Sequence, residues 1–308
     1  MAFSIVFKNI LTMLFYMALG FTLVKAKLAS SDHGKTMSAI LVYGCTPGMI
    51  ISSFQAMPYS KENAINVFKF FFVTLILQIL FYLLMILVLG KKLEQGKYRI
   101  LTCGSFMGNV GFFGTPIVTA IFPNEPIVSC YAMTFAASMN LLVFTLGEFL
   151  ITKDKKYISL KKAIINPTIL AMLVAVPMFL LDFHLPAEVV AVPTVLKAMS
   201  APICMIVLGL RLASMNVKEV FGNPFAYAVS ALKLIVFPLF CYAIVYFIPW
   251  LDSTLKISLL LTAGCPCAAV ILSLAELHEM EQKPAAYTVL MASIFCVITL
   301  PMLSLLAG

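Results

Sequence analysis

Charged residues are scarce in this chain of 308 residues, because Asp, Glu, Lys and Arg together make up only 11% of it. Soluble domains carry about 25% charged and about 45–50% apolar residues, whereas 62% of this chain is hydrophobic. A soluble core cannot bury so large an apolar fraction, so we expect most of the chain to lie in lipid. The composition excludes an ordinary cytosolic enzyme, a nucleic-acid-binding module and a disordered linker.

Histidine is also rare, and the patterns that accompany catalysis or metal binding are missing. His33, His184 and His278 form no ligand cluster, and the sequence has no phosphate-binding loop and no nucleophile elbow. The eight cysteines lie within or at the edges of apolar segments, where cysteine behaves as a small hydrophobic residue. We therefore expect neither an enzyme nor a bound cofactor.

Ten apolar segments are long enough to cross a bilayer, which takes about 20 residues. The connections between them are short and polar, so none can fold as a soluble domain. We predict an all-α integral membrane protein with ten transmembrane helices: Phe3–Val24, Thr36–Met57, Asn66–Gly90, Arg99–Ile121, Ile127–Ile151, Ala163–Leu181, Pro193–Ala213, Phe225–Trp250, Leu255–Ala275 and Pro284–Leu306.

The basic residues predict the orientation. If the N-terminus faces outward, the cytoplasmic connections hold most of the 21 Lys and Arg residues, in agreement with the positive-inside rule. The opposite side then holds little beyond Lys61, Lys256 and Lys8. We expect a multi-pass protein of the plasma membrane with both termini outside. The net charge of +8 then needs no nucleic-acid partner.

Helix-breaking residues fall at matching places in the two halves of the chain. The matched prolines, in the same order and about half a chain apart, are Pro47 with Pro202, Pro116 with Pro266, and Pro126 with Pro284. This pattern predicts two five-helix repeats, residues 1–154 and 155–308. Because five is an odd number, the second repeat would enter the membrane inverted. Chance matches among the prolines common in membrane helices are the alternative.

The fourth segment is unusually rich in glycine, with Gly104, Gly108, Gly111 and Gly114 ahead of Pro116. A proline leaves backbone groups unpaired, and a membrane tolerates such groups where they line a polar cavity. Broken helices that meet near the midplane are typical of secondary transporters, and their positive N-terminal ends suit an anionic substrate. Close helix packing is the alternative explanation for Gly104 and Gly108.

The run Gly108-Asn109-Val110-Gly111-Phe112-Phe113-Gly114-Thr115-Pro116 resembles the fourth-helix motif of the auxin efflux carrier family. That family includes plant PIN-type carriers and bacterial permeases, some assigned to malate or related organic acids. Further matches follow in order, so the resemblance covers essentially the whole chain: Asn166-Pro167, Ala201-Pro202, Leu208-Gly209-Leu210, Lys233-Leu234 and Gly264-Cys265-Pro266.

The resemblance implies a scaffold domain of helices one, two, six and seven and a transport domain of helices three to five and eight to ten. Helices four and nine would cross at Pro116 and Pro266, beside the substrate, and homodimers would form through the scaffold. Plant carriers have ionisable residues in the second helix near the site. This chain has none between Lys35 and Lys61, which disfavours auxin itself as the substrate.

The candidate substrate contacts surround the predicted crossing. Asn109 could donate to a carboxylate, and Thr115 could offer a hydroxyl or bond to its own helix. Lys233 lies inside the eighth segment, where a charge is costly. It would face the anion, support the crossing, or extend to the interface. For Asn140 we expect interhelical packing. The full set of predicted contacts is Asn109, Gly114, Thr115, Pro116, Lys233, Gly264 and Pro266.

Two acidic residues are candidates for proton coupling. Glu148 and Glu276 lie near the predicted cytoplasmic ends of the fifth and ninth segments, with a position at the lipid headgroups as the alternative. Cys265-Pro266-Cys267 is the kind of thiolate pair that binds Cu(I) in metal pumps. Those pumps need large ATP-using domains, for which this chain has no room, so we expect no metal.

We therefore expect a secondary transporter of small organic anions such as malate-like carboxylates, working by alternating access in a lipid bilayer. A sodium-coupled organic-anion importer on a related inverted-repeat fold is one alternative, and its transport would depend on sodium. A non-transporting membrane sensor is another, and it would bind a ligand without moving it.

Overall fold

The computed structural model describes residues 2–307, and every regular element in that range is a helix. Eight helical stretches are long and apolar enough to cross a membrane, which confirms a multi-pass, all-helical protein. They are Ala2–Lys25, His33–Gln55, Lys61–Glu94, Ile127–Thr152, Lys155–Leu180, Ala187–Ala213, Pro224–Tyr246 and Gln282–Ser304. The other two predicted segments, Arg99–Ile121 and Leu255–Ala275, are divided between shorter helices.

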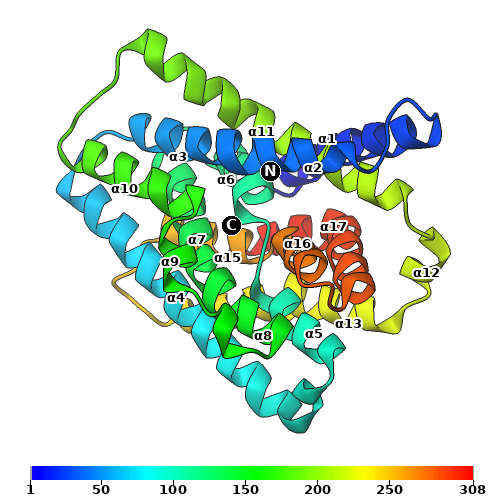
Figure 1. Cartoon of the computed structure of the whole chain (residues 1–308). Coiled ribbons are helices and arrows are strands. Elements are labelled where there is room, and N and C mark those ends of the chain that lie inside the picture. The colour runs from blue at the N-terminus through cyan, green and yellow to red at the C-terminus, as the bar shows by residue number, and fades with distance from the viewer. Residues whose placement is uncertain (1, 308) are drawn as a thin grey trace.

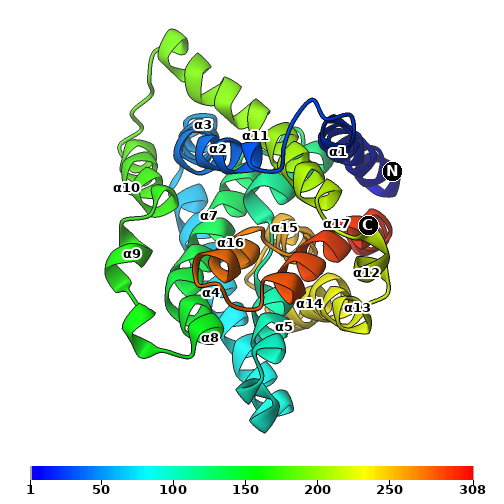
Figure 2. The ribbon, with the colours of Figure 1, turned by 45° about the vertical axis from the view of Figure 1, so that its right-hand side comes forward.

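One set of helices, here called the α11 group, occupies the upper part of both Figure 1 and Figure 2. In it α1 packs along α11, and α3 packs against both α10 and α11. A Cβ atom on Gly209 would lie 2.0 Å from the Met17 carbonyl oxygen, and one on Gly20 would lie 2.2 Å from that of Ile206. Glycine therefore lets the two backbones touch. The group consists of α1 (Ala2–Lys25), α2 (His33–Ile40), α3 (Thr46–Gln55), α10 (Pro167–Leu180) and α11 (Ala187–Ala213).

The remaining helices form a second set, the α7 group, below the first in both views. Its centre is α7, which is buried on nearly all sides, as expected for an apolar helix enclosed by other helices. Stacked rings of Phe70 and Tyr131, 4.5 Å apart, join α4 to α7. The group consists of α4 (Lys61–Leu89), α5 (Gly96–Phe106), α6 (Thr115–Ile121), α7 (Ile127–Leu142), α8 (Glu148–Thr152), α13 (Pro224–Ala231), α14 (Phe237–Tyr246), α15 (Ser253–Ala263), α16 (Val270–Leu277) and α17 (Gln282–Ser304).

Short helices connect or extend these elements. The 3-10 turns are η2 (Gly90–Glu94), η5 (Lys155–Tyr157) and η7 (Leu305–Ala307). The π-helical turns are η1 (Leu41–Cys45), η3 (Val110–Gly114), η4 (Val143–Gly147) and η6 (Leu232–Val236). The short α-helices are α9 (Leu160–Ile164) and α12 (Val217–Phe221).

Three of the π-helical turns stand directly before a proline. The turns η1, η3 and η6 precede α3, α6 and α14, which carry Pro47, Pro116 and Pro238 in their first turn. At each junction the residue before the proline donates its N–H to the carbonyl five residues back, as Thr115 does to Val110. Because proline has no N–H, the helix widens locally instead of stopping.

Two predicted helix starts lie five or more residues from the observed ones. Helix α4 begins at Lys61 rather than Asn66, because the Ser60 hydroxyl accepts the Asn63 N–H and caps the first turn. Helix α11 begins at Ala187 rather than Pro193, and Pro193 is accommodated inside it. The predicted start of the sixth segment at Ala163 falls within a short helix, Leu160–Ile164, and α10 begins at Pro167, with the Asn166 side chain as its cap.

Candidate functional site

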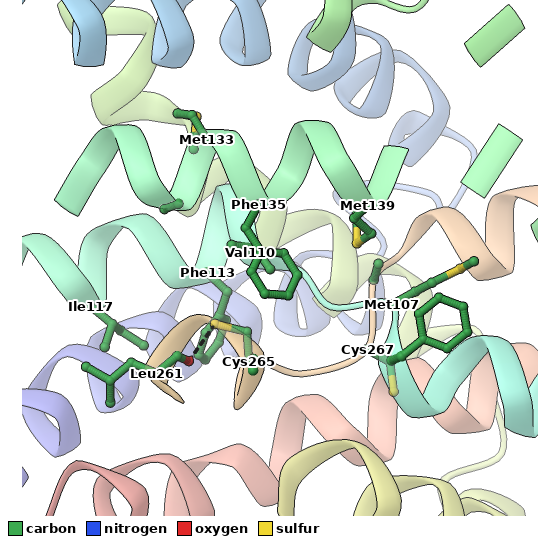
Figure 3. Packing of buried hydrophobic residues seen from close by; sticks show 14 of the residues in the cluster. Met107, Val110, Phe113, Ile117, Met133, Phe135, Met139, Leu261, Cys265 and Cys267 are labelled. Atoms are coloured by element: carbon green, nitrogen blue, oxygen red, sulfur yellow. Dashed lines mark hydrogen bonds between the residues drawn. The ribbon is translucent and has the colours of Figure 1, made fainter. Parts of the chain in front are cut away.

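Two non-helical stretches cross inside the α7 group. Met107–Asn109 follows α5, and residues 264–269 follow α15. The Asn109 N–H donates to the Pro266 carbonyl at 2.7 Å, and the Ala268 N–H donates to the Met107 carbonyl at 3.0 Å, which makes an antiparallel bridge between Gly108 and Cys267. Figure 3 shows Met107 and Cys267 side by side here. Each stretch thus pairs backbone groups of the other that lipid could not satisfy.

The predicted glycine and proline contacts serve this crossing in different ways. A Cβ atom on Gly114 would lie 3.0 Å from the Cys265 Sγ atom, and one on Gly264 would lie 2.7 Å from the Leu303 side chain, so both glycines permit close packing. Pro266 offers its carbonyl to Asn109. Pro116 lies beyond the crossing, in the first turn of α6.

Lys233 is fully buried beside the crossing and is not directed to the surface. Its Nζ atom donates to the Ala263 carbonyl at 2.5 Å and lies 4.8 Å from the centroid of the Phe237 ring. Ala263 ends α15, where carbonyls lack helical partners and the helix dipole is negative. The ammonium therefore compensates the C-terminal end of α15.

A first cavity of about 240 Å³ lies between the crossing and the α11 group. Asn109 lines it, and its side-chain amide donates to the Cys204 Sγ atom at 3.4 Å. Asn140, for which packing was expected, also lines this cavity while its amide donates to Thr168 at 3.1 Å. Lys233, Thr115 and Pro116 are not among its lining residues.

Arg211, in the last turn of α11, is the one charged residue lining the first cavity. Its Nη2 atom lies 3.4 Å from a Glu276 carboxylate oxygen. Its Nη1 atom is buried and has no hydrogen-bond partner within residues 2–307. A guanidinium matches the geometry of a carboxylate. The position of Arg211 in the cavity wall was not predicted from the sequence, because an arginine at the end of an apolar segment usually lies at the membrane interface.

Thr115 and Pro116 line a second cavity of about 320 Å³, together with Lys197 of α11. The Lys197 ammonium donates to the Ser129 hydroxyl at 2.7 Å and to the Ser53 hydroxyl at 3.1 Å. Sequence reasoning passed over this lysine, although it stands inside an apolar segment just as Lys233 does. The same criterion of depth could have found it.

The two candidate coupling carboxylates lie outside the lining of the first cavity. Glu148 is buried, with one oxygen 2.5 Å from His278 Nε2 and the other 3.7 Å from Lys162 Nζ. Glu276 is about half exposed and reaches the cavity only through Arg211. Glu276 is therefore the acidic group in direct contact with a cavity-lining cation.

The thiols of Cys265 and Cys267 contact different backbone carbonyls. Cys265 donates to Leu261 at 3.4 Å, drawn as a dashed line in Figure 3, and Cys267 donates to Gly104 at 3.2 Å. All eight cysteines are buried and free. Within residues 2–307, no group of three or more His, Cys, Asp or Glu side chains could hold a metal ion.

A family model described as membrane transport protein matches residues 5–304, which is nearly the whole chain. The chain belongs to this family. It is 25% identical over 289 residues to an uncharacterized transporter of Methanocaldococcus jannaschii, covering 89% of each chain. It is 24% identical over 301 residues to an uncharacterized transporter of Methanothermobacter thermautotrophicus, covering 96% of this chain and 97% of the relative.

Membership in the membrane transport protein family confirms the predicted resemblance to carriers of the auxin efflux type. The chain is accordingly a membrane transporter embedded in a bilayer through its apolar helices. Polar surface enclosed among the helices of such a protein is where a solute can bind, and here the two cavities supply it.

Proposed function

We propose that the protein is a secondary transporter of small organic anions, chiefly carboxylates, and that the substrate binds in the first cavity. The observation that carries this proposal is Arg211, a partly buried cation whose Nη1 atom has no partner within the described residues. Among the described residues no acidic side chain lines the cavity itself, and Glu276 contacts Arg211 from outside the lining. A substrate carboxylate would satisfy the guanidinium, as such pairs do elsewhere.

The rest of the lining favours a small and polar acid. The amides of Asn109 and Asn140 stand opposite apolar residues of α3 and α11. A cavity of about 240 Å³ is below the usual range for drug-sized ligands, about 300–1,000 Å³. Malate-like dicarboxylates and short monocarboxylates fit this description. In this proposal Arg211 takes the role of counter-charge that the sequence analysis considered for Lys233.

We further propose that residues 1–154 and 155–308 form two inverted five-helix repeats and that the protein works by alternating access around the crossing. The α11 group would be the scaffold and the α7 group the moving transport domain. This division is supported by the packing of α1, α3, α10 and α11 against one another. Both cavities are lined from both groups, so a shift between the groups would change both cavities together.

The remaining proposals concern the setting of the transporter. It would lie in the plasma membrane with both termini outside, and two copies would associate through their scaffolds. Exposed apolar side chains on α1 and α11, such as Phe15 and Val192, would contact lipid or the second copy. Glu276 would couple a proton to transport, because protonation would release Arg211 for the substrate carboxylate.

The test is uptake by purified protein in proteoliposomes, with a panel of labelled mono- and dicarboxylates and with imposed pH or sodium gradients. We expect saturable uptake of at least one acid. The variant Arg211→Met should raise its KM at least ten-fold, because the carboxylate loses its bidentate partner, whereas Lys61→Met removes an exposed charge and should change nothing.

The gradients separate the alternatives. Accumulation driven only by sodium would favour the sodium-coupled importer. Binding without uptake of any acid would favour the sensor. If Arg211→Met transports with an unchanged KM, the first cavity is not the site of the substrate carboxylate.

A further inference from the structure

Lys197 is a cation inside the helical bundle without an acidic partner. It is the one charged residue lining the second cavity, and no carboxylate of residues 2–307 lies within ion-pair distance of it. The hydroxyls that it binds, Ser53 and Ser129, are buried. A charge at such depth is costly and is a functional candidate by default.

The hydrogen bonds around Lys197 leave donors unused. Its ammonium has three N–H donors, of which two go to Ser53 and Ser129. The two hydroxyls lie 2.7 Å apart and share one further hydrogen bond, which uses one of their two protons. One ammonium proton and one hydroxyl proton therefore remain. Ser53 and Ser129 do not line the cavity but hold the ammonium, so the remaining ammonium N–H and its positive charge are what the cavity can offer to an anion.

A further polar group lies in the lining of the same cavity. The Thr115 Oγ1 atom is buried and has no hydrogen-bond partner within residues 2–307. Thr119, one turn along α6, instead donates its hydroxyl to the Thr115 carbonyl at 2.8 Å. The Thr115 hydroxyl is therefore enclosed in the wall formed by α6 and adds no exposed donor to the cavity.

The second cavity is distinct from the first but lies on the same interface between groups. Met49 of α3 lines both cavities. Arg211 and Lys197 stand at different levels of the one helix α11, and Cys204, which contacts Asn109, lies between them in the sequence. One continuous helix therefore presents a cation to each cavity.

We propose that Lys197, held in place by Ser53 and Ser129, provides a second anion-binding site at the second cavity, where the substrate carboxylate binds before or after it occupies the Arg211 site. This inference rests on the proposed function for the identity of the anion, but the positive site itself does not depend on which acid is carried. The substrate would exchange one cation of α11 for the other as the two groups shift.

The test measures the charge preference of the second cavity without knowledge of the substrate. In a Thr119→Cys variant, the new thiol reacts with methanethiosulfonates that carry either a sulfonate or a trimethylammonium group. The native cysteines are buried, and the parent protein gives their background rate. The rate with the sulfonate reagent is divided by the rate with the trimethylammonium reagent. Comparison with the same ratio for a free thiol in solution reports the electrostatic potential at the new cysteine. Thr12→Cys, exposed at the same cavity, provides a second reporter.

We expect the sulfonate reagent to be preferred and the ratio to fall at least ten-fold when Lys197→Met is added. Lys197→Arg should keep the preference, and Lys61→Met should not alter it. A purely structural role for Lys197 would change both rates together and leave the ratio unchanged, and that result overturns the site. Normal carboxylate uptake by Lys197→Met would overturn passage of the substrate through it.

The experiments distinguish failure of the second anion site from failure of the proposed transport function. If no acid is transported but the ratio depends on Lys197, the anion site stands and the organic-anion function falls. If acids are transported and the ratio ignores Lys197, the function stands and the second site falls.

Discussion

Lys233 acts on the backbone of a neighbouring helix. Its ammonium reaches the Ala263 carbonyl at the end of α15, so it holds the interruption of that helix beside Gly108. A buried carbonyl left without a donor costs about 1–3 kcal/mol. The lysine therefore contributes to the geometry of the crossing, and it does not line the first cavity.

We expect Lys233→Ala to insert into the membrane but to lose most transport, because α15 loses the donor at its C-terminal end. The measurement is uptake per amount of monodisperse purified protein. Lys256→Ala is the matched control, since Lys256 also donates to a backbone carbonyl, that of Tyr246, but at an exposed position. Uptake equal to the parent protein would show that Lys233 has no part in the transport machinery.

Depth in an apolar segment marks a cation as a candidate from sequence but does not identify its partners. The residues that flank Lys233 left both burial beside the crossing and extension to the interface open, and its partner Ala263 comes from another helix. Asn109 was predicted beside a broken helix and does line a cavity there. Arg211 escaped prediction because its exposure and its distance from Glu276 depend on how α11 packs against α16.

Helices α1 and α11 meet through backbone contacts at their glycines. The Cβ atom that Gly209→Ala adds would overlap the Met17 carbonyl and push the helices apart. Overpacking of this kind costs about 1–3 kcal/mol, so we expect a lower melting temperature in detergent. Gly44→Ala, which adds a Cβ with nothing within 4 Å, should leave it unchanged. Equal melting temperatures for both variants would contradict this close contact.

At the scale of elements, apolar length predicted where the helices lie but not how they are interrupted. The prolines suggested breaks at Pro47 and Pro116, whereas the chain absorbs both in wide turns. The actual interruption in the fourth segment lies upstream, at Met107–Asn109, where backbone bonds to residues 266 and 268 replace helical ones. Pairing between such distant residues leaves no mark in local periodicity.

The whole molecule offers a direct test of motion between its two groups. Ser53 of α3 and Ser129 of α7 have hydroxyls 2.7 Å apart across the interface, a spacing that suits a disulfide after replacement by cysteine. We expect oxidation of Ser53→Cys/Ser129→Cys to stop uptake, because the linked groups cannot shift. Reduction of the disulfide should return uptake to the level measured before oxidation.

A second cross-link serves as the control. Thr74 of α4 and Ser138 of α7 have hydroxyls 3.0 Å apart within the α7 group alone. A disulfide there should leave uptake unaffected if that group moves as one body. Continued uptake by fully oxidised Ser53→Cys/Ser129→Cys protein would rule out relative motion of the two groups.

The bridge between Gly108 and Cys267 has a consequence for how the protein is made. The ribosome synthesises residues 107–109 long before their partners at 266–268, so the first half enters the bilayer with these amides and carbonyls unpaired. The nascent chain must keep this stretch hydrated, or shielded by the insertion machinery, until the ninth segment arrives. Chains truncated before residue 268 should therefore be recognised as incomplete and degraded, even though their first five segments are intact.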